Sequence, residues 1–82
     1  MLSQLQTAAK VVGVKQSKKA IRDGNATRVF IALDAEQRVL RPVYDLCREM
    51  HVPVDEVDTM AMLGSACKID VGAAVVTVLK DA

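Results

Sequence analysis

The sequence predicts an α/β fold in which helices cover both faces of a single sheet. Two continuous apolar runs, residues 28–33 and 73–79, are rich in branched side chains, which is typical of strands buried on both faces. Segments with helical periodicity alternate with these runs along the chain. Elements in this order pack as an α/β/α sandwich. The 82 residues fit a single domain over residues 1–82, with one modest core.

The first half of the chain predicts two helices and the first buried strand. A short amphipathic helix opens the chain, since apolar residues recur there at helical spacing: Leu2, Leu5, Ala8, Ala9 and Val12. A brief extended piece within residues 10–14 leads to Gly13. The second helix is expected from about residue 15 to residue 23, where Gly24 and Asn25 end it because both tolerate the left-handed conformation. The strand at residues 28–33 follows, and Asp34 ends it.

The second half predicts two more helices and two more strands. Proline is accepted in the first turn of a helix and disfavoured inside one, so Pro42 is expected to begin a helix that ends at Met50. An irregular turn then occupies residues 35–41. Residues 54–57 form a short strand, and Asp58 or Thr59 caps a helix that runs to about residue 67. A loop at residues 69–72 precedes the last strand.

Charge is distributed unevenly, and the cysteines carry no motif. Residues 1–30 have a formal charge of +5 and residues 31–82 one of −4, so a positive end should attract a polyanion. Cys47 and Cys67 lack CxxC spacing and lie on apolar faces, which predicts buried, reduced thiols. Residues 1–10 lack a signal-peptide pattern and no apolar run reaches membrane-spanning length, so a cytoplasmic location without membrane contact is expected.

Residues 13–22 are the most informative segment. Lys15, Lys19 and Arg22 follow each other at spacings of four and three, which places them on one helix face. Gln16, which both donates and accepts hydrogen bonds, lies beside that face, and the apolar Ala20–Ile21 pair points the other way. A cationic, hydrogen-bonding helix start on an apolar anchor suits nucleic-acid recognition better than catalysis.

The chain resembles the ribosomal protein L7Ae family, which binds kink-turn RNA, and especially its short bacterial relatives. The resemblance lies in residues 12–21, 29–33, 46–47, 52–54, 63–67 and 69–76. It implies a three-layer α/β/α fold with a mixed four-stranded sheet. It also implies binding to an RNA duplex that bends sharply at a three-nucleotide bulge followed by sheared G·A pairs.

The family motif Gly-x-Asn/Lys-Glu/Gln-x-x-Lys maps onto Gly13, Lys15, Gln16 and Lys19, which are expected to contact the sheared pairs and nearby backbone. The loop at residues 69–74 is expected to pack against a flipped-out bulge nucleotide. The RNA-binding residues are therefore expected to be Gly13, Val14, Lys15, Gln16, Lys18, Lys19, Arg22, Ile69, Asp70, Val71, Gly72 and Ala73. Many archaeal and eukaryotic members have Asn-Glu in place of Lys15-Gln16, and some have a polar residue in place of Val71.

The chemistry of these side chains fits such an RNA. A-form RNA hides its major groove from side chains, and a sharp bend with non-Watson–Crick pairs opens that groove. Lys15 can then donate to guanine O6 and N7, and Gln16 can donate and accept. Three further cations suit phosphates: Lys18, Lys19 and Arg22.

Two other functions remain open from the residues. A protein-interaction adaptor is favoured by the acidic residues of the second half, namely Asp45, Glu49, Asp55, Glu56 and Asp58. An enzyme has little support, because His51 is the only histidine and no catalytic, phosphate-binding or metal-ligand spacing is present. No cofactor or metal is expected. A ribosomal kink-turn, a riboswitch and a guide RNA are all compatible partners, with or without the ribosome, and a monomer suffices.

Overall fold

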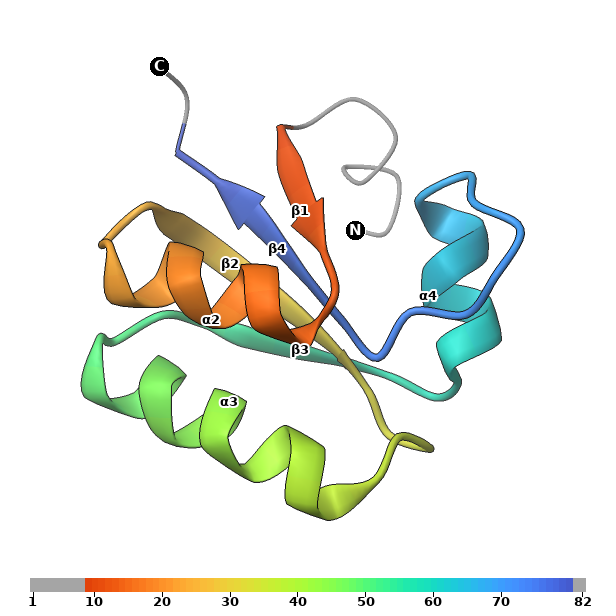
Figure 1. The fold of residues 1–82 in the computed structure, drawn as a ribbon, viewed down its shortest axis with the longest axis horizontal. Coiled ribbons are helices and arrows are strands. Elements are labelled where there is room, and N and C mark those ends of the chain that lie inside the picture. Colours follow the sequence, from red (N-terminus) through yellow and green to blue (C-terminus); the bar gives the residue numbers. More distant parts are fainter. Residues whose placement is uncertain (1–8, 81–82) are drawn as a thin grey trace.

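The computed structural model describes residues 9–80 and contains one mixed sheet with helices on both faces (Figure 1). Its elements are β1 (Lys10–Val12), α2 (Val14–Arg22), β2 (Ala26–Ala32), α3 (Gln37–Glu49), β3 (Val54–Val57), α4 (Met60–Ala66) and β4 (Val75–Leu79). The strand order is β1-β4-β2-β3; β2 and β3 are parallel, and β4 is antiparallel to both β1 and β2. The predicted three-layer α/β/α fold with a mixed four-stranded sheet is confirmed.

The central strand β2 separates two apolar clusters. Val29 and Ile31 belong to the cluster beneath α2 and α3, whereas Phe30 and Ala32 belong to the cluster beneath α4. All four side chains are at most 1% exposed. Because successive strand residues point to opposite faces, a strand covered on both sides is apolar at every position. The prediction of a strand buried on both faces is confirmed for β2.

The link from α2 to β2 requires a glycine. Gly24 has a φ of 73°, which is left-handed backbone, and its N–H donates to the carbonyl of Ile21 at 3.1 Å. Asn25 donates to the carbonyl of Ala20 at 2.9 Å, which closes the helix end. Gly24 therefore ends α2 as predicted. Asn25 does not adopt the left-handed conformation, which Gly24 alone provides at this turn.

Helix α3 begins earlier than predicted, at Gln37, and Pro42 lies inside it. The irregular turn expected over residues 35–41 is therefore wrong. Leu40, Val43 and Cys47 form one buried stripe across the proline, and burying this stripe requires helix on both sides of it. Pro42 is exposed, so the one hydrogen bond that it cannot donate is lost on the solvent side. Apolar burial outweighs the local preference against proline.

Several strand and helix limits also differ from the prediction. β2 begins at Ala26 and ends before Leu33, whose side chain is 43% exposed. β4 begins at Val75 and not at residue 73, because residues 73–74 still belong to the loop. Residues 2, 5 and 8 of the predicted opening helix lie outside the described residues, while Val12, assigned to the same apolar stripe, belongs to strand β1.

Both cysteines are free and buried, as predicted. Burial raises the pKa of the Cys47 thiol to about 11, and it raises the pKa of Cys67 above its ordinary value. Within residues 9–80, no helix has the length and apolar character needed to cross a membrane.

Candidate nucleic-acid interface

The start of α2 presents unpartnered backbone donors. Gly13 precedes the helix with a φ of 112° and a ψ of 158°, and its N–H donates to the Val75 carbonyl at 2.8 Å. The first helical bond runs from the Ser17 N–H to the Gly13 carbonyl at 3.0 Å. No side chain caps this end, and its first turn carries no acidic residue. The N–H groups of residues 14–16 thus precede the helical ladder and attract an anion.

Gly13 is required here by its backbone conformation. A φ of 112° is a conformation that residues with a side chain rarely adopt. A Cβ at this position would meet no heavy atom within 4 Å, so the space beside it is open. The backbone of Gly13 is therefore open to close approach by a ligand.

The cationic face of α2 has the predicted composition. Four of its expected RNA-binding residues are exposed, namely Lys15, Gln16, Lys19 and Arg22, while Lys18 is half-buried. Ala20 and Ile21 point into the core. Val14, which the resemblance places in the RNA-binding set, is half-buried and packs against the core cluster beneath α2 and α3.

The two halves of the charge distribution do not form separate ends of the molecule. β2, from the positive half, lies between β3 and β4, which come from the negative half. Arg28 on β2 forms an ion pair with Asp55 on β3. The excess positive charge is therefore concentrated on α2. This helix, and not a whole end of the molecule, is the surface that attracts a polyanion.

The exposed ion pair at the end of α2 restrains one cation of this face. Lys19 Nζ lies 2.9 Å from Asp23 Oδ2, and both side chains are more than half exposed. Such a pair contributes only about 0–1 kcal/mol to stability. A phosphate that contacts Lys19 must compete with the Asp23 carboxylate.

Asp23→Asn is therefore expected to raise the affinity for RNA by about 2- to 5-fold at low salt, with the gain shrinking at high salt. The reason is that the change removes a like charge facing the polyanion and releases Lys19. Fluorescence anisotropy with labelled RNA measures the effect. Asp45→Asn, which removes an exposed carboxylate from α3, is the matched control. A lower affinity for Asp23→Asn would show instead that Asp23 orients Lys19 for binding.

The loop between α4 and β4 lies close against α4. A Cβ on Gly64 would lie 2.1 Å from the Val71 carbonyl oxygen, and one on Gly72 would lie 3.0 Å from the Met60 Cβ. The Ala73 N–H donates to the Met60 carbonyl at 3.0 Å. Two glycines and one hydrogen bond thus fix the course of the loop.

The predicted loop residues divide into two groups. Ile69 packs against the core beneath α4, and Ala73 is 4% exposed, so these two anchor the loop. Asp70, Val71 and Gly72 are exposed, and Val71 is the most exposed large apolar residue within residues 9–80, at 70%. Val71 is therefore the apolar side chain of this loop that is available to a ligand.

The start of β4 connects the α2 end to a pocket at the same edge of the sheet. The Val75 carbonyl accepts the Gly13 N–H, and the preceding residue, Ala74, lines the pocket. In Figure 1, α2 and α3 run in the same direction, so both helices begin at this edge. The cationic helix start, the loop and the pocket therefore adjoin one another.

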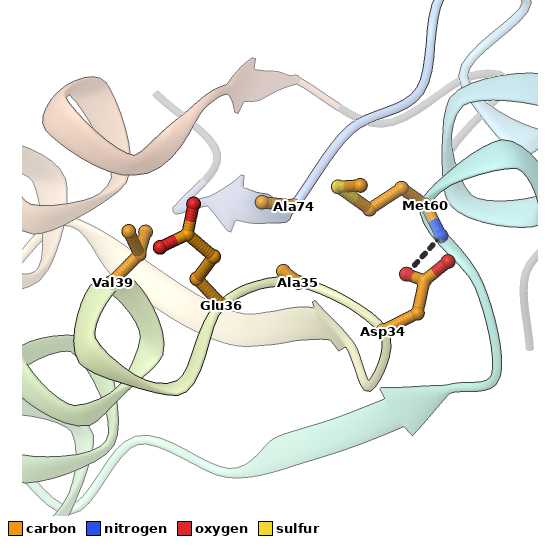
Figure 2. Close-up of a pocket in the computed structure, with 6 residues that line it drawn as sticks. All are labelled: Asp34, Ala35, Glu36, Val39, Met60 and Ala74. Carbon is orange, nitrogen blue, oxygen red and sulfur yellow. Dashed lines mark hydrogen bonds between the residues drawn. The ribbon is translucent and has the colours of Figure 1, made fainter.

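The pocket has a volume of about 230 Å³, smaller than the ~300–1,000 Å³ typical of sites for drug-sized ligands. It is lined by Asp34, Ala35, Glu36, Val39, Met60 and Ala74. Figure 2 shows the Glu36 carboxylate and the Met60 thioether approaching Ala74 from opposite sides. Asp34 Oδ1 accepts the Met60 N–H at 2.8 Å, which ties the β2–α3 turn to the start of α4. Apolar walls with a hydrogen-bond acceptor suit a single planar ring system with N–H donors.

Sequence reasoning did not identify five of these six residues. Ala74 lies in the predicted loop, but the other pocket residues come from the β2–α3 turn and from the starts of α3 and α4. The sheet order brings these segments together, and no local pattern reveals it. The one available signal was the pair of acidic residues, Asp34 and Glu36, which follow the apolar run that predicts a buried strand.

Of the residues considered for other functions, Asp55 and Glu56 are engaged within the fold. Glu56 accepts a hydrogen bond from the Tyr44 hydroxyl at 2.7 Å, and burial, together with this contact, raises the pKa of Tyr44 to about 12. Asp55 pairs with Arg28. His51 is exposed at the end of α3, with a φ of 57°. Within residues 9–80, no group of three or more His, Cys, Asp or Glu could hold a metal ion.

Several known proteins are similar to this chain in sequence and in fold. The model of the ribosomal protein L7Ae/L30e/S12e/Gadd45 family matches residues 2–82. The RNA-binding protein YbxF of Geobacillus stearothermophilus is 45% identical over 76 residues, which cover 93% of each chain. A solved protein of unknown function from Bacillus halodurans is 33% identical with a TM-score of 0.86, covering 99% of this chain and 84% of that one. The Giardia lamblia 15.5kD RNA binding protein shares the fold at 24% identity, with a TM-score of 0.89 and coverage of 98% and 71%.

Proposed function

Because the chain belongs to the ribosomal protein L7Ae/L30e/S12e/Gadd45 family, we propose that it recognises kink-turn RNA and stabilises the bend. Its general function is RNA binding, since curated relatives at 43% and 45% identity are named RNA-binding proteins. It is not an enzyme, in keeping with the family and with these relatives. What we propose beyond this general function is the type of RNA that the protein binds and the way in which it binds it.

The observation that carries the proposal is the uncapped start of α2 beside the pocket. Lys15 and Gln16 are exposed there, next to backbone N–H groups that lack helical partners. Together they supply cationic, amide and backbone donors within one helical turn. This combination matches guanine edges in an opened major groove, flanked by phosphates. An intact A-form duplex does not present those edges, because its major groove is too narrow.

The pocket supports the same RNA shape. A bulge nucleotide that leaves the helical stack exposes its ring and its N–H groups. Met60, Val39 and Ala74 offer apolar contact to a ring, and Glu36 offers an acceptor to its N–H groups. Val71 adds an exposed apolar side chain on the neighbouring loop. A protein with these two adjoining sites favours an RNA that holds an opened groove and an unstacked base close together.

Binding stabilises the bend by mass action. A protein that binds the bent RNA and not the extended form shifts the population toward the bent form. The phosphate contacts are limited to the cations of α2 and their neighbours. We therefore expect log Kd to change with log salt with a slope of magnitude roughly 2 to 4.

The test is a salt titration of RNA affinity with two RNAs. One carries a three-nucleotide bulge and sheared G·A pairs; in the other, Watson–Crick pairs replace the G·A pairs. We expect at least about 100-fold tighter binding of the first RNA and the shallow slope stated above. Equal affinity for both RNAs, or a slope magnitude near 8, would refute the proposal, because either result indicates a broad and unselective basic surface.

A further inference from the structure

We propose that Arg38 is a positioning residue for the pocket: its guanidinium fixes the Glu36 carboxylate toward the base in the pocket and binds the phosphate of the same nucleotide. The inference rests on the proposed function and names a residue that neither the sequence motif nor the pocket lining includes. Its basis is a contact at the start of α3.

The contact joins the capping residue of α3 to the second residue of that helix. Arg38 Nε donates to Glu36 Oε2 at 2.9 Å. Glu36 lines the pocket, and Figure 2 shows its carboxylate between Val39 and Ala74. The side chains of Arg38 and Glu36 are 85% and 67% exposed, so the pair stands at the pocket mouth. Arg38 therefore engages the one carboxylate that faces Ala74.

Helix stability does not account for this arrangement. Glu36 occupies the capping position of α3, yet its side chain makes no capping hydrogen bond. Arg38 lies in the first turn, where a positive charge opposes the helix macrodipole. An exposed ion pair of this kind contributes little to folding. The negative charge of Glu36 suits the helix N-terminus, but the positive charge of Arg38 does not, so helix stability does not explain the position of Arg38.

Ligand chemistry does account for it. A bare carboxylate at the pocket would repel an incoming polyanion, and the guanidinium offsets that charge without removing the acceptor. Arginine carries five N–H donors in a rigid fork, and Nε engages Glu36. The remaining donors of the fork can take a phosphate in bidentate geometry. Lysine would restore the charge but cannot hold a carboxylate and a phosphate in one plane.

Three variants separate these roles. Arg38→Gln removes the guanidinium, and Arg38→Lys keeps only its charge. Arg41→Gln is the matched control, because Arg41 is also an exposed arginine of α3, whereas it is Arg38 that donates to the pocket residue Glu36. Each variant is titrated against the kink-turn RNA and against the same RNA with an abasic site at the unstacked bulge nucleotide. Melting curves check that each variant stays folded.

For Arg38→Gln we expect a loss of about 10-fold on the intact RNA and only about 2- to 3-fold on the abasic RNA. Arg41→Gln should lose about 2-fold on both RNAs, and Arg38→Lys should recover less than half of the loss in log Kd. Equal losses for Arg38→Gln and Arg41→Gln, or a loss independent of the base, would overturn the inference. If wild-type protein does not bind the kink-turn RNA selectively, the proposed function itself fails.

Discussion

Gly64→Ala is expected to lower the free energy of unfolding by about 2–4 kcal/mol. The added Cβ would lie 2.1 Å from the Val71 carbonyl oxygen and 3.1 Å from the Gly72 Cα. Both neighbours are backbone atoms, so no side-chain rotation relieves the overlap. The loop must move away from α4, although the Ala73 N–H still binds the Met60 carbonyl at its other end. Urea unfolding followed by circular dichroism measures the loss.

The same variant is expected to bind RNA at least about 10-fold more weakly at temperatures where it remains folded, because Val71 and Ala74 move with the loop. Ser65→Ala is the matched control, since Ser65 is the next residue of α4 and is exposed. Its stability should stay within about 0.5 kcal/mol of the wild type. A Gly64→Ala protein as stable as that control would contradict the close packing of loop and helix.

Gln16→Ala is expected to weaken binding to RNA with sheared G·A pairs by about 10- to 100-fold and to leave duplex binding nearly unchanged. Gln16 is exposed in the first turn of α2, so the loss falls on recognition and not on folding. Alanine is also the better helix former. The measurement is the affinity for the kink-turn RNA and for its Watson–Crick counterpart.

Lys19→Ala provides the comparison for that prediction. Lys19 lies on the same helix face and suits a phosphate, so its loss should weaken both RNAs by a similar factor of about 3 to 5 and reduce the salt slope by about one. If both variants lose affinity equally on the plain duplex, Gln16 does not recognise bases. The proposed division, in which Gln16 recognises bases and Lys19 binds a phosphate, is then wrong.

The fold class follows from the sequence because its strongest signals are local. β2 is apolar at four consecutive positions, and that pattern needs no knowledge of what covers the strand. The predicted start of α3 is wrong for a related reason. Pro42 is a strong local signal, but burial of the stripe through Leu40 and Val43 depends on a surface that only the folded sheet provides. The predicted start of β4 is wrong for the same reason, since the pairing of β4 with β2 begins at Val75.

The two parts of the candidate interface, the cationic face of α2 and the pocket, also differ in how far local sequence signals predict them. The cationic face of α2 is contiguous in sequence, so spacing alone places Lys15, Lys19 and Arg22 together. The pocket is assembled from three separated segments, one of which is Ala74. Its existence depends on the parallel pairing of β2 with β3 and the antiparallel pairing of β2 with β4. Glu36 and Met60 carry no signal of their proximity in the sequence.

The most direct test of the account is resonance energy transfer on a kink-turn RNA labelled at both helical ends, titrated with the protein in low magnesium. We expect a rise to high transfer at submicromolar protein and no rise for an RNA whose G·A pairs are replaced by Watson–Crick pairs. Binding of both RNAs without any change in transfer would contradict it, because the protein would then hold RNA without favouring the bend.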